Sequence, residues 1–429
     1  MINLKSWGLF PKIKNKAISL TNLDLVKKFS KSKSVIPYGN GRSYGDSALN
    51  PDIIYCRPKN ELIEFNKENG FIHCEAGILL SEIIEETIPY GWFLHTTPGT
   101  KFITLGGAIA SDIHGKNHHS YGCFSECILE FNLLIGDKIY NVKRGDKLFL
   151  ATCGGMGLTG VIIDVKFNLK KISSSNINQI LVCTKNLTET FDAFEKYSKY
   201  TYSVAWIDCL SSGKNLGRSV INIGEFANDK IYSLSKKNKI NIPFYFPSFI
   251  LNHYTVKIFN FLYYNLNSIN KRKSKVSYDT FFYPLDSILN WNRIYGSNGF
   301  TQYQFIFPKR TSFEAIKLIL NKISKTRMGS FLAVLKLYGK SNSNYLSFPM
   351  EGYSLAIDFK ISKNLFPFLD ELDKIVVKYS GRIYLSKDSR MKTDVFEKGY
   401  PELKKFKKIR KEMNLNKMYN SVQSLRLDL

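Results

Sequence analysis

Closely spaced cysteines are missing from this sequence of 429 residues. The seven cysteines are an odd number, they all lie between Cys56 and Cys209, and none belongs to a C-x-x-C pair. A disulfide framework needs paired cysteines and a zinc knuckle needs closely spaced ones, so neither is expected. A reducing, cytoplasmic compartment is the expected location.

Long apolar runs are also scarce. The segment Met1–Ala17 contains no apolar stretch long enough for the core of a signal peptide. The most hydrophobic segment, Ile242–Leu266, is broken at Pro247, Asn252 and Lys257. A bilayer-spanning helix needs ~20 nearly unbroken apolar residues, so none is expected.

The aromatic residues of Ile242–Leu266 are followed by the basic run Lys271-Arg272-Lys273. Aromatic and basic residues in succession suit a segment that lies in the headgroup region of a membrane. They suit a lid over a substrate site equally well. The sequence leaves both interpretations open.

Acidic residues are few, since 36 Asp and Glu stand against 61 Lys and Arg, a net charge of +25. The excess favours nucleic acid, an anionic membrane surface or a phosphate-bearing ligand as partner, although lysine-rich loops would produce the same number. The lysines are dispersed and no RRM, KH or helix-turn-helix signature occurs, so nucleic acid is not expected. The composition is that of a folded globular protein, and we expect two domains.

Residues 1–172 are assigned to the first domain, in which short β-rich runs, glycine clusters and brief helical patterns alternate. The patterns predict helices at Leu23–Phe29 and Ser81–Ile88, the second with Ser81 as its N-cap. Strands are predicted over residues 34–37, 53–56 and 72–75.

Residues 173–381 are assigned to a second domain. Alternating aromatic segments such as Tyr303–Phe307 predict an antiparallel sheet, and helical patterns at Ser312–Ser324 and Leu365–Tyr379 predict helices that cover it. Residues 213–277 are poorly periodic and lysine-rich, which predicts a long mobile excursion.

Residues 382–429 return to short motifs and contain a basic helical pattern at Tyr400–Met413. This segment is expected to rejoin the first domain. The predicted fold class is α+β.

The first of three glycine-rich motifs is Pro37-Tyr-Gly-Asn-Gly-Arg-Ser-Tyr-Gly-Asp-Ser47. The backbone N–H groups of such a loop can converge on an anion, and Arg42 can add charge-assisted bonds to a phosphate. A Rossmann fingerprint requires G-x-G-x-x-G at the start of a helix, whereas here the third glycine comes one residue late. An ordinary glycine turn is the alternative.

The second motif follows Thr97-Pro-Gly99 and runs from Thr104 through Gly106-Gly107 to Ser111. Small residues after a pair of glycines predict a short helix whose N-terminal N–H groups face a phosphate.

The same motif continues as Asp112-Ile-His-Gly-Lys-Asn-His-His119. Two histidines share a helical face, but Gly115 interrupts the helix and no H-E-x-x-H pattern occurs, so no metal is expected. His114 or Lys116 is expected to supply a proton or a hydrogen bond to a flat ring or a substrate oxygen. The remaining histidines are expected to be partly structural.

The third motif, Gly154–Gly160, contains a literal G-x-G-x-x-G. The residues after it, Val161–Phe167, alternate and are β-branched, which predicts a strand instead of the helix that a Rossmann site requires. The glycines are expected to let the end of this strand approach a ligand closely.

In this order, the three motifs resemble those of the FAD-binding oxidoreductases of the vanillyl-alcohol oxidase fold, also called the PCMH type. Within them, the chain resembles the flavoprotein oxidase subunits of decaprenylphosphoryl-ribose 2-epimerases. The resemblance covers nearly the whole chain and includes Trp291-Asn-Arg293, Gln302-Tyr-Gln304, Leu346-Ser-Phe-Pro349 and Lys387-Asp-Ser-Arg390. It implies a PCMH-type FAD-binding domain of two subdomains, completed by the C-terminal segment, with a substrate domain inserted between.

The resemblance also implies a set of FAD-binding residues. It suggests non-covalent binding, because His114 is followed by Gly115-Lys116 as in members that bind FAD without a linkage. By analogy the cofactor is contacted by Pro37, Tyr38, Gly39, Asn40, Gly41, Arg42, Ser43, Tyr44, Gly45, Asp46, Ser47, Gly99, Thr104, Leu105, Gly106, Gly107, Ser111, Asp112, Ile113, His114, Val161 or Ile162, and Tyr384.

Other residues are expected to face the substrate. Lys387 is the leading candidate for activating a sugar hydroxyl, since burial and positive neighbours can lower the pKa of a lysine enough to make it a base. His114 and Tyr44 are the rival proton acceptors, and a purely electrostatic role for Lys387 is the alternative. The substrate-binding residues implied by the resemblance are Lys116, Gln302, Gln304, Lys336 and Lys387.

In this family the C2 hydroxyl of a ribose linked to polyprenyl phosphate is oxidised to a 2-keto sugar, and an NAD(P)H-dependent short-chain reductase then forms the arabinose epimer. The resemblance implies the same reaction here, in the cytoplasm or peripherally at the inner face of the cell membrane. A related oxidase acting on a soluble sugar or aldonolactone is the alternative. Two positions depart from the pattern of the family: Ala356 stands where the mycobacterial members carry a cysteine, and Ser354 stands where an asparagine is usual.

Overall fold

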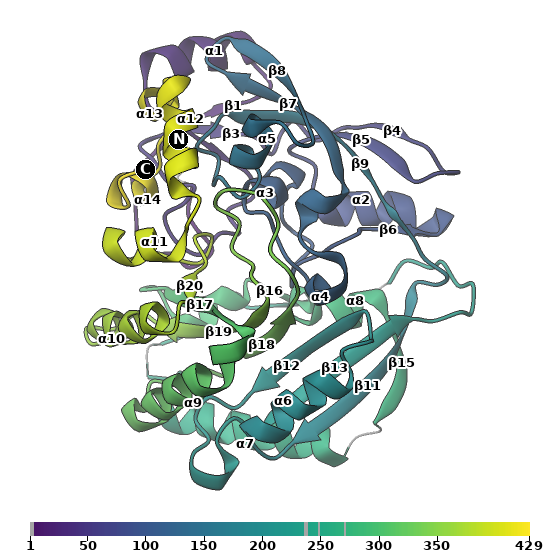
Figure 1. Ribbon diagram of the computed structural model, residues 1–429. Coiled ribbons are helices and arrows are strands. Elements are labelled where there is room, and N and C mark those ends of the chain that lie inside the picture. Colours follow the sequence, from purple (N-terminus) through teal and green to yellow (C-terminus); the bar gives the residue numbers. More distant parts are fainter. Residues whose placement is uncertain (1–3, 236–238, 248, 270–271) are drawn as a thin grey trace.

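The computed structural model describes residues 4–235, 239–247, 249–269 and 272–429 (Figure 1). Helices and strands are mixed along the chain, which confirms the predicted α+β class. Most of the strands belong to three sheets, two in the N-terminal part and one that follows them in sequence.

The N-terminal part contains a small parallel sheet and a larger antiparallel one. The parallel sheet has the order β1-β3-β2, formed by Lys16–Ser19, Asp52–Tyr55 and Ile36–Tyr38. The antiparallel sheet has the order β4-β5-β9-β7-β8, formed by Leu62–Phe65, Phe71–Glu75, Val161–Asn168, Ile128–Ile135 and Lys138–Lys143. The helices of this part are α1 (Leu23–Ser32), α2 (Leu80–Thr87), α3 (Leu105–Ala110), α4 (His118–Tyr121) and α5 (Lys147–Thr152).

The predicted helices α1 and α2 are confirmed, but the predicted N-cap of α2 is wrong. The helix begins at Leu80, so Ser81 lies inside its first turn and is buried. Leu79 is the capping residue, and its backbone N–H donates to Glu82 Oε2 at 2.8 Å. The acidic residue three positions after the cap therefore fixes the start of the helix two residues earlier than the serine would.

The third sheet is antiparallel throughout and has the order β15-β11-β13-β12-β18-β19-β17-β20. Its strands are Lys273–Ser277, Asn176–Thr184, Ser219–Phe226, Tyr202–Ile207, Ala333–Tyr338, Gly352–Lys360, Phe300–Pro308 and Arg382–Ile383. Helices α6 (Leu187–Lys196), α9 (Lys309–Thr326) and α10 (Leu365–Lys378) pack against it. An antiparallel sheet covered by helices was the expectation for this part of the chain, and α9 and α10 lie where predicted.

The two faces of this sheet have different chemistry because side chains alternate along a strand. On β17, Tyr303 faces the helices, since its hydroxyl donates to Asp373 of α10 at 2.8 Å. Gln302 and Gln304 therefore point to the opposite face, where they line a cavity. On the neighbouring strand β18, Lys336 lies on the same polar face.

Residues 213–277 are more regular than expected. Strand β13 (Ser219–Phe226) pairs with both β11 and β12 inside the sheet, and α7 (His253–Ile269) packs on the cavity side of β11 and β13. These two stretches are therefore regular elements, while the mobility of the segment stays a prediction; residues 236–238, 248, 270 and 271 of the same segment lie outside the described residues. Apolar residues on the outer side of α7 mask the helical period, which is why the sequence pattern fails here.

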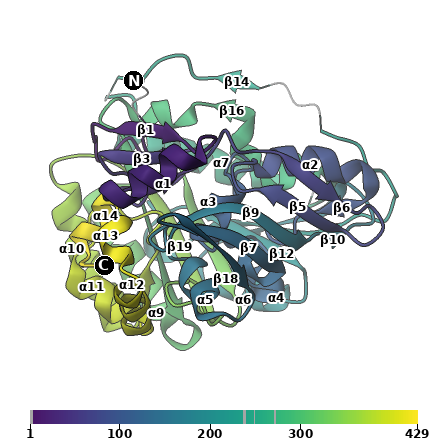
Figure 2. The ribbon, with the colours of Figure 1, turned by 90° about the horizontal axis from the view of Figure 1, so that it is seen from above.

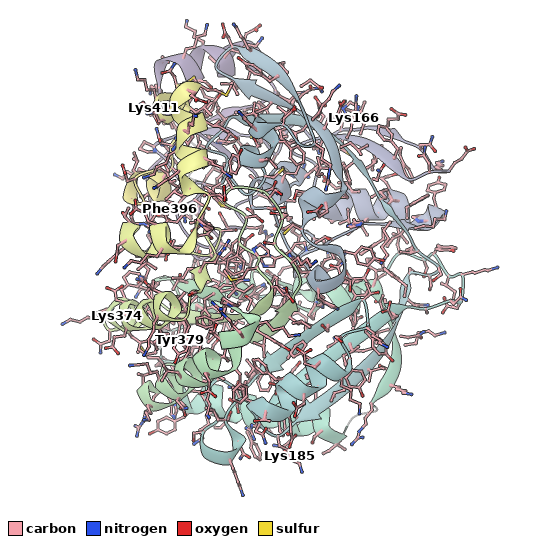
Figure 3. The ribbon with its side chains drawn as sticks, in the orientation of Figure 1. Lys166, Lys185, Lys374, Tyr379, Phe396 and Lys411 are labelled. Carbon is pink, nitrogen blue, oxygen red and sulfur yellow. The ribbon has the colours of Figure 1, made fainter. Side chains whose placement is uncertain are left out.

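No helix within the described ranges is long and apolar enough to cross a membrane. The positive charge is spread over the surface: Lys185, Lys374 and Lys411 extend outward from three distant parts of the molecule (Figure 3).

The C-terminal segment returns to the N-terminal part of the molecule. Helix α13 (Leu415–Met418) lies close to α1 in both views, α12 (Leu403–Glu412) packs against α13 and α5, and α14 (Val422–Arg426) follows near the end of the chain (Figures 1 and 2). Val35 and Tyr419 form a parallel bridge, with the Val35 N–H donating to the Met418 carbonyl at 2.8 Å.

A buried ion network joins this segment to two loops of the molecule. The Arg426 guanidinium contacts Asp46 at 2.9 Å and Asp388 at 2.8 Å, and both carboxylates are almost fully buried. The pKa of Arg426 is raised despite its burial, because the carboxylate of Asp388 and then that of Asp46 stabilise the cation. Arg426 thereby fixes the loop of Asp46 against the loop of Asp388.

Substitution of Arg426 should destabilise the folded protein. We expect Arg426→Gln to lower the free energy of unfolding by about 3 kcal/mol, because two buried carboxylates lose their cation. The control is Lys407→Gln, which breaks an exposed contact with Asp428 and should cost less than about 1 kcal/mol. Denaturant unfolding of both variants measures the difference, and equal losses would contradict a clamping role for Arg426.

Candidate functional site

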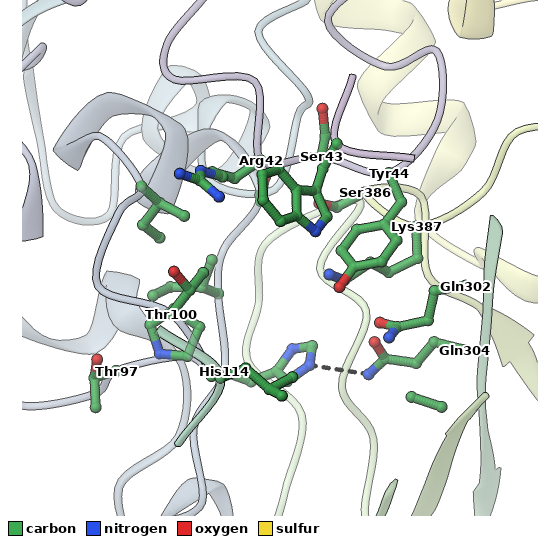
Figure 4. A pocket seen from close by; sticks show the side chains of 18 of the residues that line it. Arg42, Ser43, Tyr44, Thr97, Thr100, His114, Gln302, Gln304, Ser386 and Lys387 are labelled. Atoms are coloured by element: carbon green, nitrogen blue, oxygen red, sulfur yellow. Dashed lines mark hydrogen bonds between the residues drawn. The ribbon is translucent and has the colours of Figure 1, made fainter. Parts of the chain in front are cut away.

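A cavity of about 780 Å³ lies between the glycine-rich loops and the polar face of the eight-stranded sheet (Figure 4). This volume is within the range of about 300–1,000 Å³ that small-molecule sites occupy. Predicted site residues from distant parts of the sequence meet there: Pro37, Tyr38, Gly39, Asn40, Gly41, Arg42, Ser43, Tyr44, Ser47, Gly99, Thr104, Gly106, Gly107, Ser111, Ile113, His114, Lys116, Ile162, Gln302, Gln304, Lys336, Tyr384 and Lys387.

Five residues predicted to contact the cofactor do not line this cavity. Leu105 and Val161 are fully buried in the hydrophobic core. Gly45 packs so closely on the loop of the C-terminal segment that a Cβ atom would meet the Asp388 carbonyl at 1.8 Å. Asp46 holds Arg426, as described above.

The fifth such residue, Asp112, is also buried and organises a neighbouring loop. Its carboxylate accepts hydrogen bonds from the side chains of Asn342, Asn344 and Ser347 at 2.7–2.8 Å. Asp112 has a positive φ of 36°, a conformation that these bonds help to hold. Its place is therefore behind the cavity wall, two residues before His114.

The loop that follows β2 presents unused hydrogen-bond donors to the cavity. Within the described part of the chain, the backbone N–H groups of residues 39–43 have no acceptor. Gly41 has φ +62°, and a Cβ there would meet the Tyr38 hydroxyl at 2.0 Å, so only glycine fits. The Arg42 guanidinium lies 4.1 Å from the Trp7 ring centre, at the same end of the cavity. Converging N–H groups beside a cation suit a phosphate or pyrophosphate.

The predicted short helix after Thr104 exists as α3, but its first N–H groups do not face a ligand. The N–H of Leu105 donates to Ile78, that of Gly106 to Ala76, and that of Gly107 to the Thr104 hydroxyl. The phosphate-binding role predicted for these groups is therefore wrong. Small residues are needed here because a Cβ on Gly106 would press on Ala76 at 3.2 Å.

In another part of the cavity, polar side chains from four parts of the chain point toward one another (Figure 4). His114 comes from the loop after α3, and Gln302 and Gln304 come from β17. Tyr44 and Lys387 lie beside each other, with the Lys387 ammonium 3.6 Å from the centre of the Tyr44 ring.

His114 is held in one orientation by its neighbours. Gln304 Nε2 lies 3.1 Å from His114 Nε2 and 3.4 Å from Ser354 Oγ, so the amide donates and the imidazole Nε2 accepts. The proton is then on Nδ1, which is buried and has no partner among the described residues. Burial, followed by the charges of Lys336, His118 and Lys387, lowers the pKa of His114 well below its usual value. His114 is therefore a neutral hydrogen-bond donor toward the cavity.

Three lysines of the cavity are partly buried, and their pKa values are lowered. Burial lowers the pKa of Lys116 to about 7, with the charge of Lys336 adding to the effect, and it lowers that of Lys336 to about 8. The pKa of Lys387 is lowered by burial, while the nearby Asp358 carboxylate opposes the shift. Lys116 is tethered to the Phe281 carbonyl, whereas the ammonium groups of Lys336 and Lys387 have no hydrogen-bond acceptor within the described ranges.

Several lining residues were not predicted. Trp7 stacks on Arg42, and the Asp286 carboxylate accepts from the Lys101 backbone N–H at 2.8 Å. Both line the cavity, together with Trp291. Neither Trp7 nor Asp286 lies in a glycine or histidine motif, so a single sequence gives no signal for them.

Comparison with known proteins identifies the class of this site. Residues 23–137 match the family model described as an FAD binding domain. The chain is 34% identical over 414 residues to decaprenylphosphoryl-β-D-ribose oxidase from Mycolicibacterium smegmatis, covering 92% of this chain and 90% of that protein. It is 25% identical to an uncharacterized protein in the mprA 5' region of Streptomyces coelicolor, covering 82% of this chain and all of that protein. It is also 27% identical over 187 residues to L-gulonolactone oxidase from Scyliorhinus torazame, covering 42% of this chain and 41% of that protein.

The fold and the cavity are those of an FAD-dependent oxidoreductase of the PCMH type. The chain belongs to the family of FAD-binding oxidoreductases that includes decaprenylphosphoryl-β-D-ribose oxidase. The residues present fit FAD, because the free N–H groups of residues 39–43 suit its pyrophosphate and the unpaired Nδ1 of His114 suits a polar atom of a flat ring.

The glycine loop gives a test of cofactor binding. We expect Gly41→Ala to lose most of its bound FAD, because the added methyl group clashes with Tyr38 in a backbone conformation that disfavours alanine. Gly213→Ala is the matched control, since Gly213 also has a positive φ but faces open space away from the cavity. The visible flavin absorption per protein measures the effect, and normal flavin content in Gly41→Ala would contradict this assignment.

Proposed function

We propose that this protein oxidises the C2 hydroxyl of a ribose linked to a polyprenyl phosphate, giving the 2-keto sugar. This is the first half of a 2-epimerisation to the arabinose form. The relative that covers most of the chain is named for the oxidation of decaprenylphosphoryl-β-D-ribose. FAD dependence belongs to the family, while the substrate and the position of oxidation are the proposal.

The observation that carries the proposal is the group of partly buried lysines that line the cavity. Lys116, Lys336 and Lys387 all line the cavity, and partly burying cationic lysines such as Lys116 and Lys336 costs free energy unless an anion compensates them. A phosphate attached to the anomeric carbon of a sugar supplies that anion and leaves the neighbouring C2 hydroxyl close to it. A neutral substrate would leave Lys116 and Lys336 without a compensating anion.

Bound FAD supplies the oxidising centre, which accepts the two electrons and the hydrogen that leave C2 of the sugar. The protein has to hold the sugar and take the hydroxyl proton. Lys387 is our candidate base, because burial lowers its pKa and favours the neutral amine. Tyr44 suits this step poorly, since burial raises its pKa well above the usual value.

His114 and the two glutamines are assigned to orientation. His114 accepts from Gln304 and offers its Nδ1 proton to the cavity, which suits a hydrogen bond to an oxygen of the substrate or the cofactor. Gln302 donates to Asp358 at 2.6 Å and leaves its carbonyl oxygen available to a sugar hydroxyl. Lys336 and Lys116 are assigned to the phosphate.

The product defines the partners that we propose. A 2-keto sugar has to be reduced from the opposite face to complete an epimerisation, which calls for an NAD(P)H-dependent short-chain reductase. A polyprenyl phosphate is anchored in a bilayer, so the protein would work in the cytoplasm, peripherally at the inner face of the cell membrane.

A water-soluble sugar or aldonolactone is the second candidate substrate. The likeness to L-gulonolactone oxidase over 42% of the chain supports it. Anaerobic addition of a prenyl-phosphoribose or an aldonolactone to the yellow holoprotein distinguishes the two candidate substrates. Bleaching by the phosphorylated lipid alone supports our proposal, and bleaching by the lactone alone overturns it.

The role of Lys387 can be tested separately from cofactor binding. We expect Lys387→Ala to keep its bound flavin but to lose flavin bleaching by substrate by at least about a hundredfold, since general base catalysis contributes roughly that much. Lys185→Ala, which removes an exposed lysine far from the cavity, serves as the control. Stopped-flow absorbance measures both rates, and a normal rate in Lys387→Ala would rule out this lysine as the base.

The lowered pKa values of the phosphate lysines predict a pH effect on substrate binding. Lys116 and Lys336 titrate near pH 7 and 8 in the free protein, so they lose the charge that binds phosphate as pH rises. We expect the KM for a phosphorylated substrate to rise by about tenfold or more between pH 7 and 9. Lys336→Gln should raise KM and flatten the profile; a wild-type KM that stays constant over this range contradicts the assignment.

A further inference from the structure

Helix α7 has one side fixed to the sheet. Val256 and Asn260 are buried, and the Asn260 amide donates to Asp208 at 2.8 Å. The rings of Tyr263 and Trp206 lie 4.6 Å apart on the cavity side of the sheet. The position of the helix is therefore determined by packing.

The opposite side of α7 is apolar and exposed. Tyr254, Ile258, Leu262, Leu266 and Ile269 expose between 52% and 84% of their surface. Their spacing of four, four, four and three residues places them on one helical face. An exposed apolar stripe of this length on a surface helix marks an interaction site.

Two further exposed aromatic residues precede α7 in the chain. Phe244 is 61% exposed and Phe249 is 74% exposed. We use the name outer α7 face for these two residues together with the five exposed residues of the helix.

The charge around this face has one sign. From residue 230 to residue 278 the sequence contains nine Lys and Arg and no Asp or Glu. Lys239, Lys257, Arg272 and Lys273 are exposed within it. Apolar side chains surrounded by cations complement a bilayer that carries anionic headgroups.

The same helix is a wall of the cavity. Phe259, Tyr263 and Asn267 line the cavity from α7, next to apolar strand residues such as Leu181 and Val220. The helix therefore separates the outer α7 face from the apolar end of the substrate cavity.

We propose that the outer α7 face docks the protein on an anionic lipid bilayer, with α7 lying in the headgroup interface. The prenyl chain of the substrate then passes from the bilayer alongside α7 into the cavity. This second statement rests on the function proposed above, whereas the docking itself does not.

The test uses the full-length holoprotein and vesicles of phosphatidylcholine with or without phosphatidylglycerol. We expect co-sedimentation with the anionic vesicles, weakened by salt, and at least tenfold weaker binding for Ile258→Glu combined with Leu266→Glu. The control is Leu25→Glu combined with Leu318→Glu, which adds the same charge to exposed leucines of α1 and α9. Flavin absorption and thermal unfolding confirm that both double variants are folded.

Three results would overturn the docking proposal. They are absence of vesicle binding by the unmodified protein, equal loss in both double variants, and a dimer that Ile258→Glu with Leu266→Glu dissociates, since a second copy would then cover the face. Failure of the proposed function is a separate outcome, because vesicle binding needs no substrate. If docking and function both hold, Ile258→Glu with Leu266→Glu keeps normal flavin bleaching by a short-chain, water-soluble prenyl-phosphoribose.

Discussion

The partly buried lysines of the cavity are the constraint on which the rest of this structure depends. Each ammonium group loses its hydration when it enters a protein interior, and several kcal/mol are lost for each ion that finds no counter-charge. Lys336 and Lys387 reach the cavity from different parts of the chain, a strand of the sheet and a loop of the C-terminal segment. The packing of sheet, loops and helices has to hold them there, and an anionic substrate recovers part of that cost.

This requirement explains why the C-terminal segment returns to the start of the chain. Lys387 and Asp388 are adjacent, and Asp388 is bound to Arg426, which also binds Asp46 of the glycine-rich loop. The Tyr44 backbone N–H donates to the Ser386 carbonyl at 3.0 Å in the same region. The loop that faces the cofactor and the loop that carries the candidate base are thus held as one unit.

Much of this architecture could be predicted from the sequence, because the relevant signals are local. Alternating residues such as Tyr303–Phe307 identify a strand, and glycines with positive φ such as Gly41 identify a tight loop. Contacts between distant segments left no such signal. The first N–H groups of α3 donate to the carbonyl oxygens of Ile78 and Ala76, and Trp7 reaches the cavity from the N-terminal segment. The apolar residues on the exposed side of α7 obscured its helical periodicity in the sequence.

The central claim is the position at which the sugar is oxidised, and direct identification of the product tests it. The holoprotein is given one equivalent of a prenyl-phosphoribose without oxygen, and the product is trapped with borodeuteride before its sugar is analysed by mass spectrometry. Our account predicts deuterium at C2, in a mixture of ribose and arabinose. Deuterium at another carbon, or bleached flavin with no label in the sugar, would contradict it.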